Sequence, residues 1–190
     1  MALNKKTLWQ VRFAAHVIRM GGVVAHPTEA IWGLACDPFN PQAVARLLTI
    51  KQRPLSKGLI LVSGQSAHFE SLLSPLPDNL RARFFQQTSH PITWLVPDKH
   101  DLVPHYLRGQ HSSIALRLTQ HTVFAALSQV LGHALVSTSA NPTGRQPADS
   151  LFKVNQYFAN EIDYILPAVL GGFSKPSEIR DLKTNSILRF

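Results

Sequence analysis

Short apolar runs that alternate with amphipathic segments are the feature that most restricts the fold of this chain. The runs are too short for buried helices, and turn-forming or polar residues bound them, which is typical of strands. We predict strands at residues 23–26, 59–62, 92–96, 114–118, 134–136, 164–166, 178–182 and 186–190. Because helical segments separate these runs along the whole length, the pattern favours an α/β domain with a mixed sheet.

Helical spacing of apolar residues indicates where the helices lie. The first helix ends at Gly21-Gly22, a stop signal that accepts a left-handed backbone. Asn40 before Pro41 predicts an N-cap and a first-turn proline for a second helix, which ends near Lys51. Further helices are predicted at residues 78–87, 122–131 and 151–158.

Size and charge limit the classes of protein that this chain can represent. Its 190 residues fit one domain, which we expect to span residues 1–190. A net charge of +8 favours polyanionic partners such as nucleotides or RNA. No apolar run approaches the ~18 residues that span a bilayer, and no signal-peptide core follows the N-terminus, so we expect no membrane contact and a cytoplasmic location. The single cysteine, Cys36, agrees with a reducing compartment.

Motifs of the commonest nucleotide and metal sites are absent from the sequence. There is neither a G-x-x-x-x-G-K-[ST] nor a G-x-G-x-x-G segment, so any bound ATP is held without a P-loop or a Rossmann turn. The histidines are scattered without H-E-x-x-H spacing, and we therefore assign no metal site made by the protein.

Polar residues adjoin the first two apolar runs. Thr28 follows the first strand and can donate to a carboxylate or accept from an ammonium group, although an ordinary turn also explains this segment. Lys51, Arg53 and Lys57 place three cations in one short loop before the next strand. Such a loop suits a triphosphate, and a solvated charge cluster is the alternative.

Two later strands carry polar residues as well. Strand alternation points Ser113, Ala115 and Arg117 to one face, and a mid-strand guanidinium can hold a carboxylate through two hydrogen bonds, unless the strand is an edge that faces water. The strand at residues 134–136 opens into the hydroxyl-rich run around Ser139 and Asn141, which taken alone is a capped turn.

These segments, in this order, resemble the YrdC-type threonylcarbamoyl-AMP synthase family in its short bacterial form. The family hallmarks are a Pro-Thr-[Glu/Asp] turn, a Lys-x-Arg pair with a following lysine, and a Ser-x-Asn. The matching residues are Pro27-Thr28-Glu29, Lys51-Gln52-Arg53 with Lys57, and Ser139-Ala140-Asn141. Ser113 to Arg117, and Pro176-Ser177-Glu178-Ile179 through Leu188-Arg189, match further segments of the family. The resemblance runs from about residue 8 to the end of the chain.

The resemblance implies a single-domain α/β fold with a twisted mixed parallel and antiparallel sheet, flanking helices and a basic concave face. It implies a nucleotidyltransferase that converts L-threonine, bicarbonate or carbon dioxide, and ATP into threonylcarbamoyl-adenylate and pyrophosphate. This product is the precursor of N6-threonylcarbamoyladenosine in tRNA. A threonylcarbamoyl-transferase machinery downstream, and tRNA itself, are the macromolecular partners that the resemblance suggests.

The resemblance also assigns roles to single residues. ATP would contact Lys51, Arg53, Lys57, Ser113, Asn141 and Arg189, and threonine would contact Thr28, Arg117, Ser139 and Ser177. No covalent nucleophile is implied, because orientation and charge stabilisation by Lys51, Arg53 and Lys57 would promote the reaction. Mg²⁺ would arrive with ATP.

Two departures and two alternatives accompany this interpretation. Ala30 stands where many family members have a hydroxyl residue, and Gly58 follows Lys57 where proline is common. A non-catalytic protein that binds tRNA or ribosomal RNA through the basic concavity would also explain the charge, although no run of aromatic residues offers base stacking. The related module of carbamoyl-transfer maturation proteins requires cysteine-rich zinc modules, which one cysteine cannot build.

Overall fold

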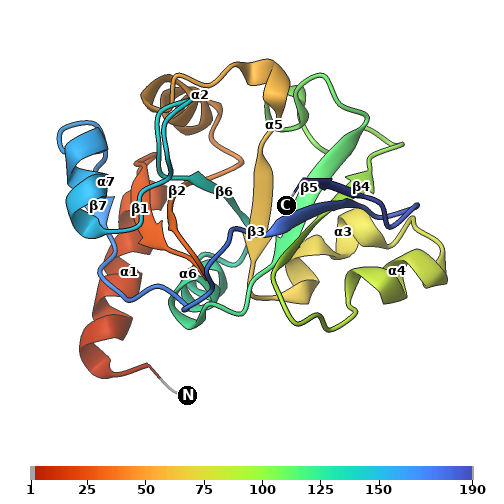
Figure 1. Cartoon of the computed structure of the whole chain (residues 1–190), viewed down its shortest axis with the longest axis horizontal. Coiled ribbons are helices and arrows are strands. Elements are labelled where there is room, and N and C mark those ends of the chain that lie inside the picture. The colour runs from red at the N-terminus through yellow and green to blue at the C-terminus, as the bar shows by residue number, and fades with distance from the viewer. Residues whose placement is uncertain (1–2, 190) are drawn as a thin grey trace.

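A twisted mixed sheet runs through the computed structural model, which describes residues 3–189 (Figure 1). Within these residues the sheet has nine strands in the order β7-β1-β2-β6-β3-β5-β4-β8-β9. The strands are β1 Val24–Pro27, β2 Trp32–Cys36, β3 Ile60–Ser63, β4 Ile92–Pro97, β5 Ser113–Leu118, β6 Leu135–Ser139, β7 Tyr164–Ile165, β8 Glu178–Asp181 and β9 Ile187–Arg189. Three neighbouring pairs are parallel, β1 with β7, β3 with β5 and β4 with β8, and the others are antiparallel.

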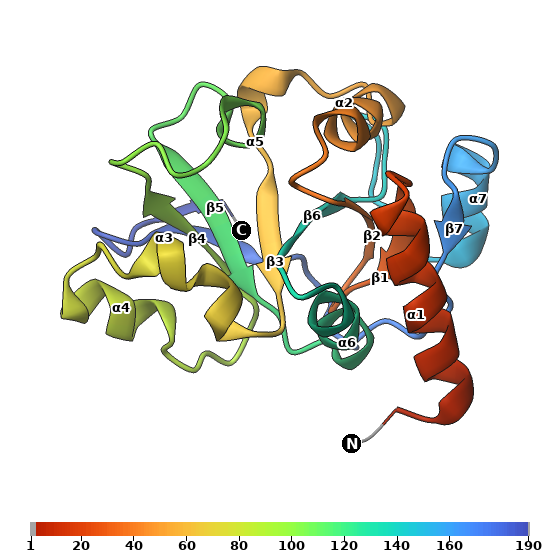
Figure 2. The ribbon, with the colours of Figure 1, turned by 180° about the vertical axis from the view of Figure 1, so that it is seen from behind.

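Helices flank the sheet and close its apolar surfaces. They are α1 Lys5–Arg19, α2 Pro41–Ile50, α3 Glu70–Leu73, α4 Asp78–Phe84, α5 His105–Arg108, α6 Thr122–Leu131 and α7 Leu151–Phe158, with short 3₁₀ turns at Leu55–Lys57 and Ser66–Phe69. Figure 2 shows α1 and α6 side by side in front of the strands when the molecule is seen from behind. The mixed sheet with flanking helices confirms the predicted fold class.

The core divides into two clusters because successive residues of a strand face opposite sides of the sheet. Val24, Ala35, Val62 and Leu135 pack against the apolar stripes of α1 and α6. Their neighbours on the same strands face the opposite cluster, which contains α2, α4 and α7. Helices α1 and α6 cover only part of their face of the sheet, and the rest of that face forms the site described below.

Local signals in the sequence predicted the longer elements well. Gly21 adopts φ +83° just after α1, and the Asn40 side chain caps α2 by accepting from the backbone N–H groups of Gln42 and Ala43 at 3.1 Å. Helices α6 and α7 have the predicted bounds, and the predicted strands agree with the observed ones to within a few residues. Residue 190, the last of the predicted final strand, lies outside the described residues.

Three elements were not predicted: β2, α3 and α5. Residues 27–34 were interpreted as a turn, but β2 begins at Trp32. All five residues of β2 are buried, so the strand lacks the alternation of apolar and polar residues that marks a half-exposed strand. Helices α3 and α5 are single turns of four residues, too short to show helical periodicity.

The sheet twists so strongly that its β8–β9 end curls back over the middle strands. Figure 1 shows the last hairpin, β8 and β9, in front of β5, and Arg189 of β9 lines the same cavity as Ser139 of β6. The sheet is therefore concave on this side, and the last hairpin forms one wall of the concavity. Among the described residues, no helix is both long and apolar enough to cross a membrane.

Candidate functional site

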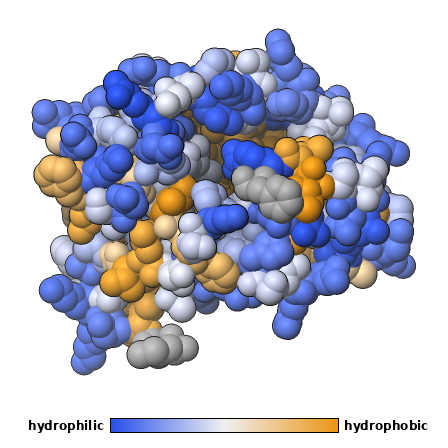
Figure 3. Space-filling model, viewed as in Figure 1, coloured by the Kyte–Doolittle hydropathy of each residue, from blue (hydrophilic) through white to orange (hydrophobic). Residues whose placement is uncertain are grey.

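A cavity of about 390 Å³ occupies the concave face of the sheet. Its floor is a row of side chains on adjacent strands that pair in register, Ser137, Ile60, Ala115 and Leu95. Paired residues share a face, so this row continues the face that α1 and α6 cover elsewhere. The space-filling view shows the hollow near the centre of the molecule, with hydrophilic residues around most of it (Figure 3). A cavity of this size suits a small-molecule ligand.

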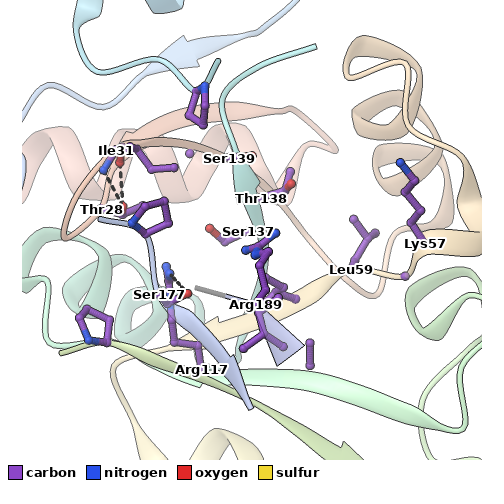
Figure 4. A pocket seen from close by; sticks show the side chains of 18 of the residues that line it. Thr28, Ile31, Lys57, Leu59, Arg117, Ser137, Thr138, Ser139, Ser177 and Arg189 are labelled. Carbon is purple, nitrogen blue, oxygen red and sulfur yellow. Dashed lines mark hydrogen bonds between the residues drawn. The ribbon is translucent and has the colours of Figure 1, made fainter. Parts of the chain in front are cut away.

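The cavity brings together most of the residues that the sequence suggested. Those that line it are Thr28, Arg53, Lys57, Ser113, Arg117, Ser139, Ser177 and Arg189. They come from both ends of the chain, and the sheet and the last hairpin assemble them. In Figure 4 Lys57 stands on one side of the cavity, here called the first side, and Thr28 and Ser177 stand on the opposite, second side, with Arg189 between them.

Three cations surround the first side of the cavity. Arg53 donates through Nη2 to the Gly58 carbonyl at 2.9 Å, which braces the basic loop. Within residues 3–189, none of Arg53, Lys57 and Arg189 forms an ion pair. Burial and the neighbouring Arg189 lower the pKa of Arg53. Unpaired cations that repel one another in this way favour a polyanion such as a triphosphate.

Hydroxyls and one ion pair form the second side. Thr28 donates its hydroxyl proton to the Ile31 carbonyl at 2.7 Å, and its Oγ1 accepts long hydrogen bonds from the backbone N–H groups of Ala30 and Ile31 at 3.5 and 3.4 Å. Arg117 Nη1 donates to Ser177 Oγ at 3.4 Å, and Nη2 lies 3.7 Å from a carboxylate oxygen of Glu29 (Figure 4 draws the contact with Ser177). Because β5 lies between β3 and β4, Arg117 is not on an edge strand, and it is buried.

Glu29 balances the charge of Arg117. Thr119 Oγ1 donates to Glu29 Oε1 at 2.5 Å, while the other oxygen, Oε2, is buried without a hydrogen bond among the described residues. Burial alone would raise the pKa of this carboxyl, but the charge of Arg117 and the hydrogen bond from Thr119 lower it. Arg117 Nε is likewise buried without a partner among residues 3–189. A zwitterion supplies both the acceptor and the donor that this pair lacks.

Lys51 and Asn141, two further residues from the sequence analysis, do not line the cavity. Lys51 Nζ donates to the Ser139 carbonyl and, at 2.8 Å, to the Asn141 carbonyl. Asn141 Nδ2 donates to the carbonyls of Pro142 and Arg145 at 3.0 and 2.8 Å. Both side chains hold the loop after β6 in place beneath the cavity wall.

Several lining residues were given no role from the sequence, although Glu29 belongs to the Pro27-Thr28-Glu29 motif. They include Glu29, Arg108, His111, Ser137, Thr138 and Lys175. Ser137 had a signal, because it lies two residues before Ser139 on one strand and must share its face. Arg108, His111 and Lys175 had none, since Arg108 ends the short helix α5 and the other two lie in loops, and tertiary packing carries all three to the cavity.

Comparison with known proteins identifies the family. The profile of the Sua5/YciO/YrdC family, described as "Telomere recombination", matches residues 16–190. This chain belongs to that family. The resemblance drawn from the motifs is therefore confirmed. A family member from Marinobacter nauticus named threonylcarbamoyl-AMP synthase is 47% identical over 180 residues, which are 95% of each chain. One of the same name from Hahella chejuensis is 48% identical over 181 residues, 95% of this chain and 98% of the other.

Solved structures of the family share the fold. Sua5 from P. abyssi in complex with L-threonine has a TM-score of 0.77 and 27% identity, covering 92% of this chain and 51% of that one. The chain thus spans about half the length of this Sua5 protein, but nearly the full length of the curated relatives. E. coli YciO has a TM-score of 0.81 at 22% identity, covering 96% of this chain and 89% of that one, and shows the fold alone.

Proposed function

We propose that this family member is a threonylcarbamoyl-AMP synthase, a nucleotidyltransferase acting on L-threonine, bicarbonate or carbon dioxide, and ATP. The observation that carries the proposal is one cavity with unpaired cations on one side and hydroxyls beside a half-satisfied arginine–glutamate pair on the other. The names of the full-length relatives support the same activity. They also favour an enzyme over the non-catalytic RNA-binding alternative.

The reaction needs two bond-forming steps. The neutral amine of threonine attacks the carbon of bicarbonate or carbon dioxide and forms an N-carboxylate, with loss of water or a proton respectively. A carboxylate oxygen then attacks the α-phosphorus of ATP, the bond to the bridging oxygen of the β-phosphate breaks, and pyrophosphate leaves. Orientation of the reactants and stabilisation of the phosphate charge are the main contributions expected from the protein.

The two sides of the cavity fit the two ligands. We assign the triphosphate and nucleotide to Arg53, Lys57, Ser113 and Arg189, because four negative charges require cations. Lys51 and Asn141 would support this side indirectly through the loop after β6.

The amino acid is assigned to the hydroxyl side of the cavity, at Thr28, Arg117, Ser139 and Ser177. Its carboxylate suits the guanidinium of Arg117, and the hydroxyls offer donors and acceptors to its remaining polar groups.

Other partners belong to the same proposal. Mg²⁺ would arrive with ATP, since divalent cations bridge phosphate oxygens. The product would pass to a threonylcarbamoyl-transferase that modifies adenosine in tRNA, and direct tRNA contact would use the basic concave face. One domain over residues 1–190 and a cytoplasmic location remain predictions from the sequence.

Pyrophosphate release tests the proposal. The purified protein should release pyrophosphate from ATP only when threonine and bicarbonate are both present, because these two form the nucleophile. Omitting each substrate in turn is the control, and mass spectrometry should detect the threonylcarbamoyl-adenylate. Production of ADP, or pyrophosphate release that is indifferent to threonine, would contradict the assignment.

A further inference from the structure

His26 and Ser137 form a buried hydrogen-bonded pair beneath the cavity. Ser137 lies on β6 and lines the cavity, whereas His26 on β1 is 0% exposed. Strand β2 lies between their strands, and the imidazole crosses it at Gly33. A Cβ atom at Gly33 would lie 2.8 Å from His26 Nε2, so only glycine leaves room for the ring to reach Ser137.

The hydrogen bonds of His26 fix its tautomer. Nδ1 lies 3.0 Å from the carbonyl oxygen of Pro27, and a carbonyl can only accept, so Nδ1 carries a proton. Nε2 lies 3.1 Å from Ser137 Oγ. In a neutral ring Nε2 has no proton, and it must therefore accept the hydroxyl proton of Ser137.

The surroundings of the His26 imidazole keep it neutral and fix its orientation. Phe124 of α6 packs against it with ring centroids 4.4 Å apart. Burial is the main reason that the pKa of His26 falls to about 3, and the charges of His121 and Arg117 lower it further against the opposing effects of the Pro27 carbonyl and Glu29. So weak a base does not take a proton from a substrate near neutral pH, which excludes a proton relay through this pair.

The consequence lies at the cavity floor. A serine hydroxyl has one proton and two lone pairs, and the proton of Ser137 is committed to His26. Toward the cavity Ser137 offers only lone pairs, so it can accept a hydrogen bond but cannot donate one. The guanidiniums and ammonium groups there are donors only, Glu29 offers a carboxylate acceptor, and the other hydroxyls can donate or accept. Ionised phosphate oxygens only accept, so they cannot use Ser137 as an acceptor, but an amino group can donate to it.

We propose that Ser137 accepts a hydrogen bond from the amino group of the amino-acid substrate, and that His26 is the positioning residue that keeps Ser137 an acceptor. This inference rests on the proposed function. The amine must present its lone pair to the carbon of bicarbonate or carbon dioxide. A donating hydroxyl would occupy that lone pair, whereas an accepting one binds an N–H and leaves the lone pair free for attack.

A double-mutant cycle on threonine binding tests the pair. His26→Phe keeps an aromatic ring and removes the acceptor, and Ser137→Ala removes the hydroxyl. Each should weaken threonine binding about 3- to 10-fold in calorimetry, as expected for the loss of one hydrogen bond between neutral groups. Because His26 acts only through Ser137, the double variant should bind no more weakly than Ser137→Ala. Multiplicative losses would overturn the proposal.

A second ligand and a second measurement separate this role from loss of structure. β-Hydroxybutyrate keeps the carboxylate and hydroxyl of threonine but lacks the amine, so its affinity and that of ATP should be the same in all four proteins. Equal weakening of β-hydroxybutyrate would overturn the proposal. Nitrogen-15 NMR of the wild type should show His26 neutral with the proton on Nδ1 from about pH 5 to 8, and any other tautomer or a charged ring would contradict it. If the wild type binds no threonine, the proposed function itself fails.

Discussion

A lysine ammonium that is buried without a carboxylate is an expensive arrangement, and Lys51 shows it. The residue is 2% exposed, and among residues 3–189 its Nζ donates only to the carbonyl oxygens of Ser139 and Asn141. Burial, and then the positive charge of Arg53, lower the pKa of Lys51 to about 7. The Lys51 ammonium group therefore stabilises the loop after β6, and it loses its proton near neutral pH.

This pKa predicts how stability changes with pH. An unfolded lysine titrates near 10.4, so between about pH 7 and 10 the unfolded state binds more protons than the folded state. The free energy of unfolding of the wild type should then rise with pH, relative to Lys51→Met, by up to about 1.4 kcal/mol per pH unit. Urea unfolding of both proteins at pH 7 and pH 9 measures this, with equal dependence on urea as the control. A difference that does not change with pH would contradict the lowered pKa.

Side-chain direction was predictable only where it depends on the local backbone. Strand alternation placed Ser113 and Arg117 on one face, and both line the cavity. Lys51 and Asn141 lie in loops, where the direction of a side chain depends on contacts between distant segments. The hydrogen bond from Lys51 Nζ to the Asn141 carbonyl, for example, joins residues 90 positions apart in the sequence. Nothing in the sequence around either residue indicates that contact.

At the scale of elements, Gly64 lies where the end of β3 meets α6, and it makes the closest approach to a neighbouring segment of any described glycine. A Cβ atom at Gly64 would lie 2.2 Å from the Cβ of Ala125 and 2.6 Å from its Cα. The Gly64 amide donates to Ser128 Oγ at 3.1 Å, and this hydroxyl donates to the Ala125 carbonyl at 2.9 Å. The end of the strand thus positions the helix that carries Phe124 against His26.

Gly64→Ala should therefore destabilise the protein by about 1–3 kcal/mol, because backbone atoms of α6 must move to admit a methyl group. Thermal unfolding followed by circular dichroism should show a lower Tm. The matched control is Gln129→Ala, which changes an exposed side chain on the same helix and should leave Tm nearly unchanged. Equal Tm values for wild type and Gly64→Ala would show that the helix does not dock this closely.

Elements were predictable from the sequence when their own residues determine them. The cap of α2 and the apolar stripes of α2 and α6 are local signals, and these helices appear where expected. Strand β2 is stabilised by tertiary contacts instead, because it pairs on both sides, with β1 and β6. Its Gly33 leaves room for the His26 ring and has a low propensity for strands. The curl that brings Arg189 over the sheet is likewise a property of the whole sheet.

At the scale of the whole molecule, net charge and site geometry differ in how selectively they favour a ligand. The charge of +8 attracts any polyanion, RNA as well as ATP. The cavity is more selective, because it gathers Arg53, Lys57 and Arg189 around one hollow that hydroxyl groups also line. A cation inside this cavity and a cation elsewhere on the surface should therefore differ in what their removal does.

Arg53→Ala and Arg12→Ala remove the same charge from two such places, since Arg12 is exposed on α1 and outside the cavity. For a synthase, Arg53→Ala should lower the rate of pyrophosphate release by about 10²–10³, because the guanidinium would stabilise charge that develops on the phosphates. Arg12→Ala should leave that rate unchanged.

Affinity for tRNA should respond weakly to either substitution. The slope of log affinity against log salt concentration should fall by at most about one unit, because a groove that follows an RNA backbone sums many phosphate contacts. Measuring both quantities on both variants, with circular dichroism to verify folding, tests the whole assignment. Equal pyrophosphate release by folded Arg53→Ala and Arg12→Ala would remove Arg53 from the nucleotide site and leave the basic cavity without its proposed role.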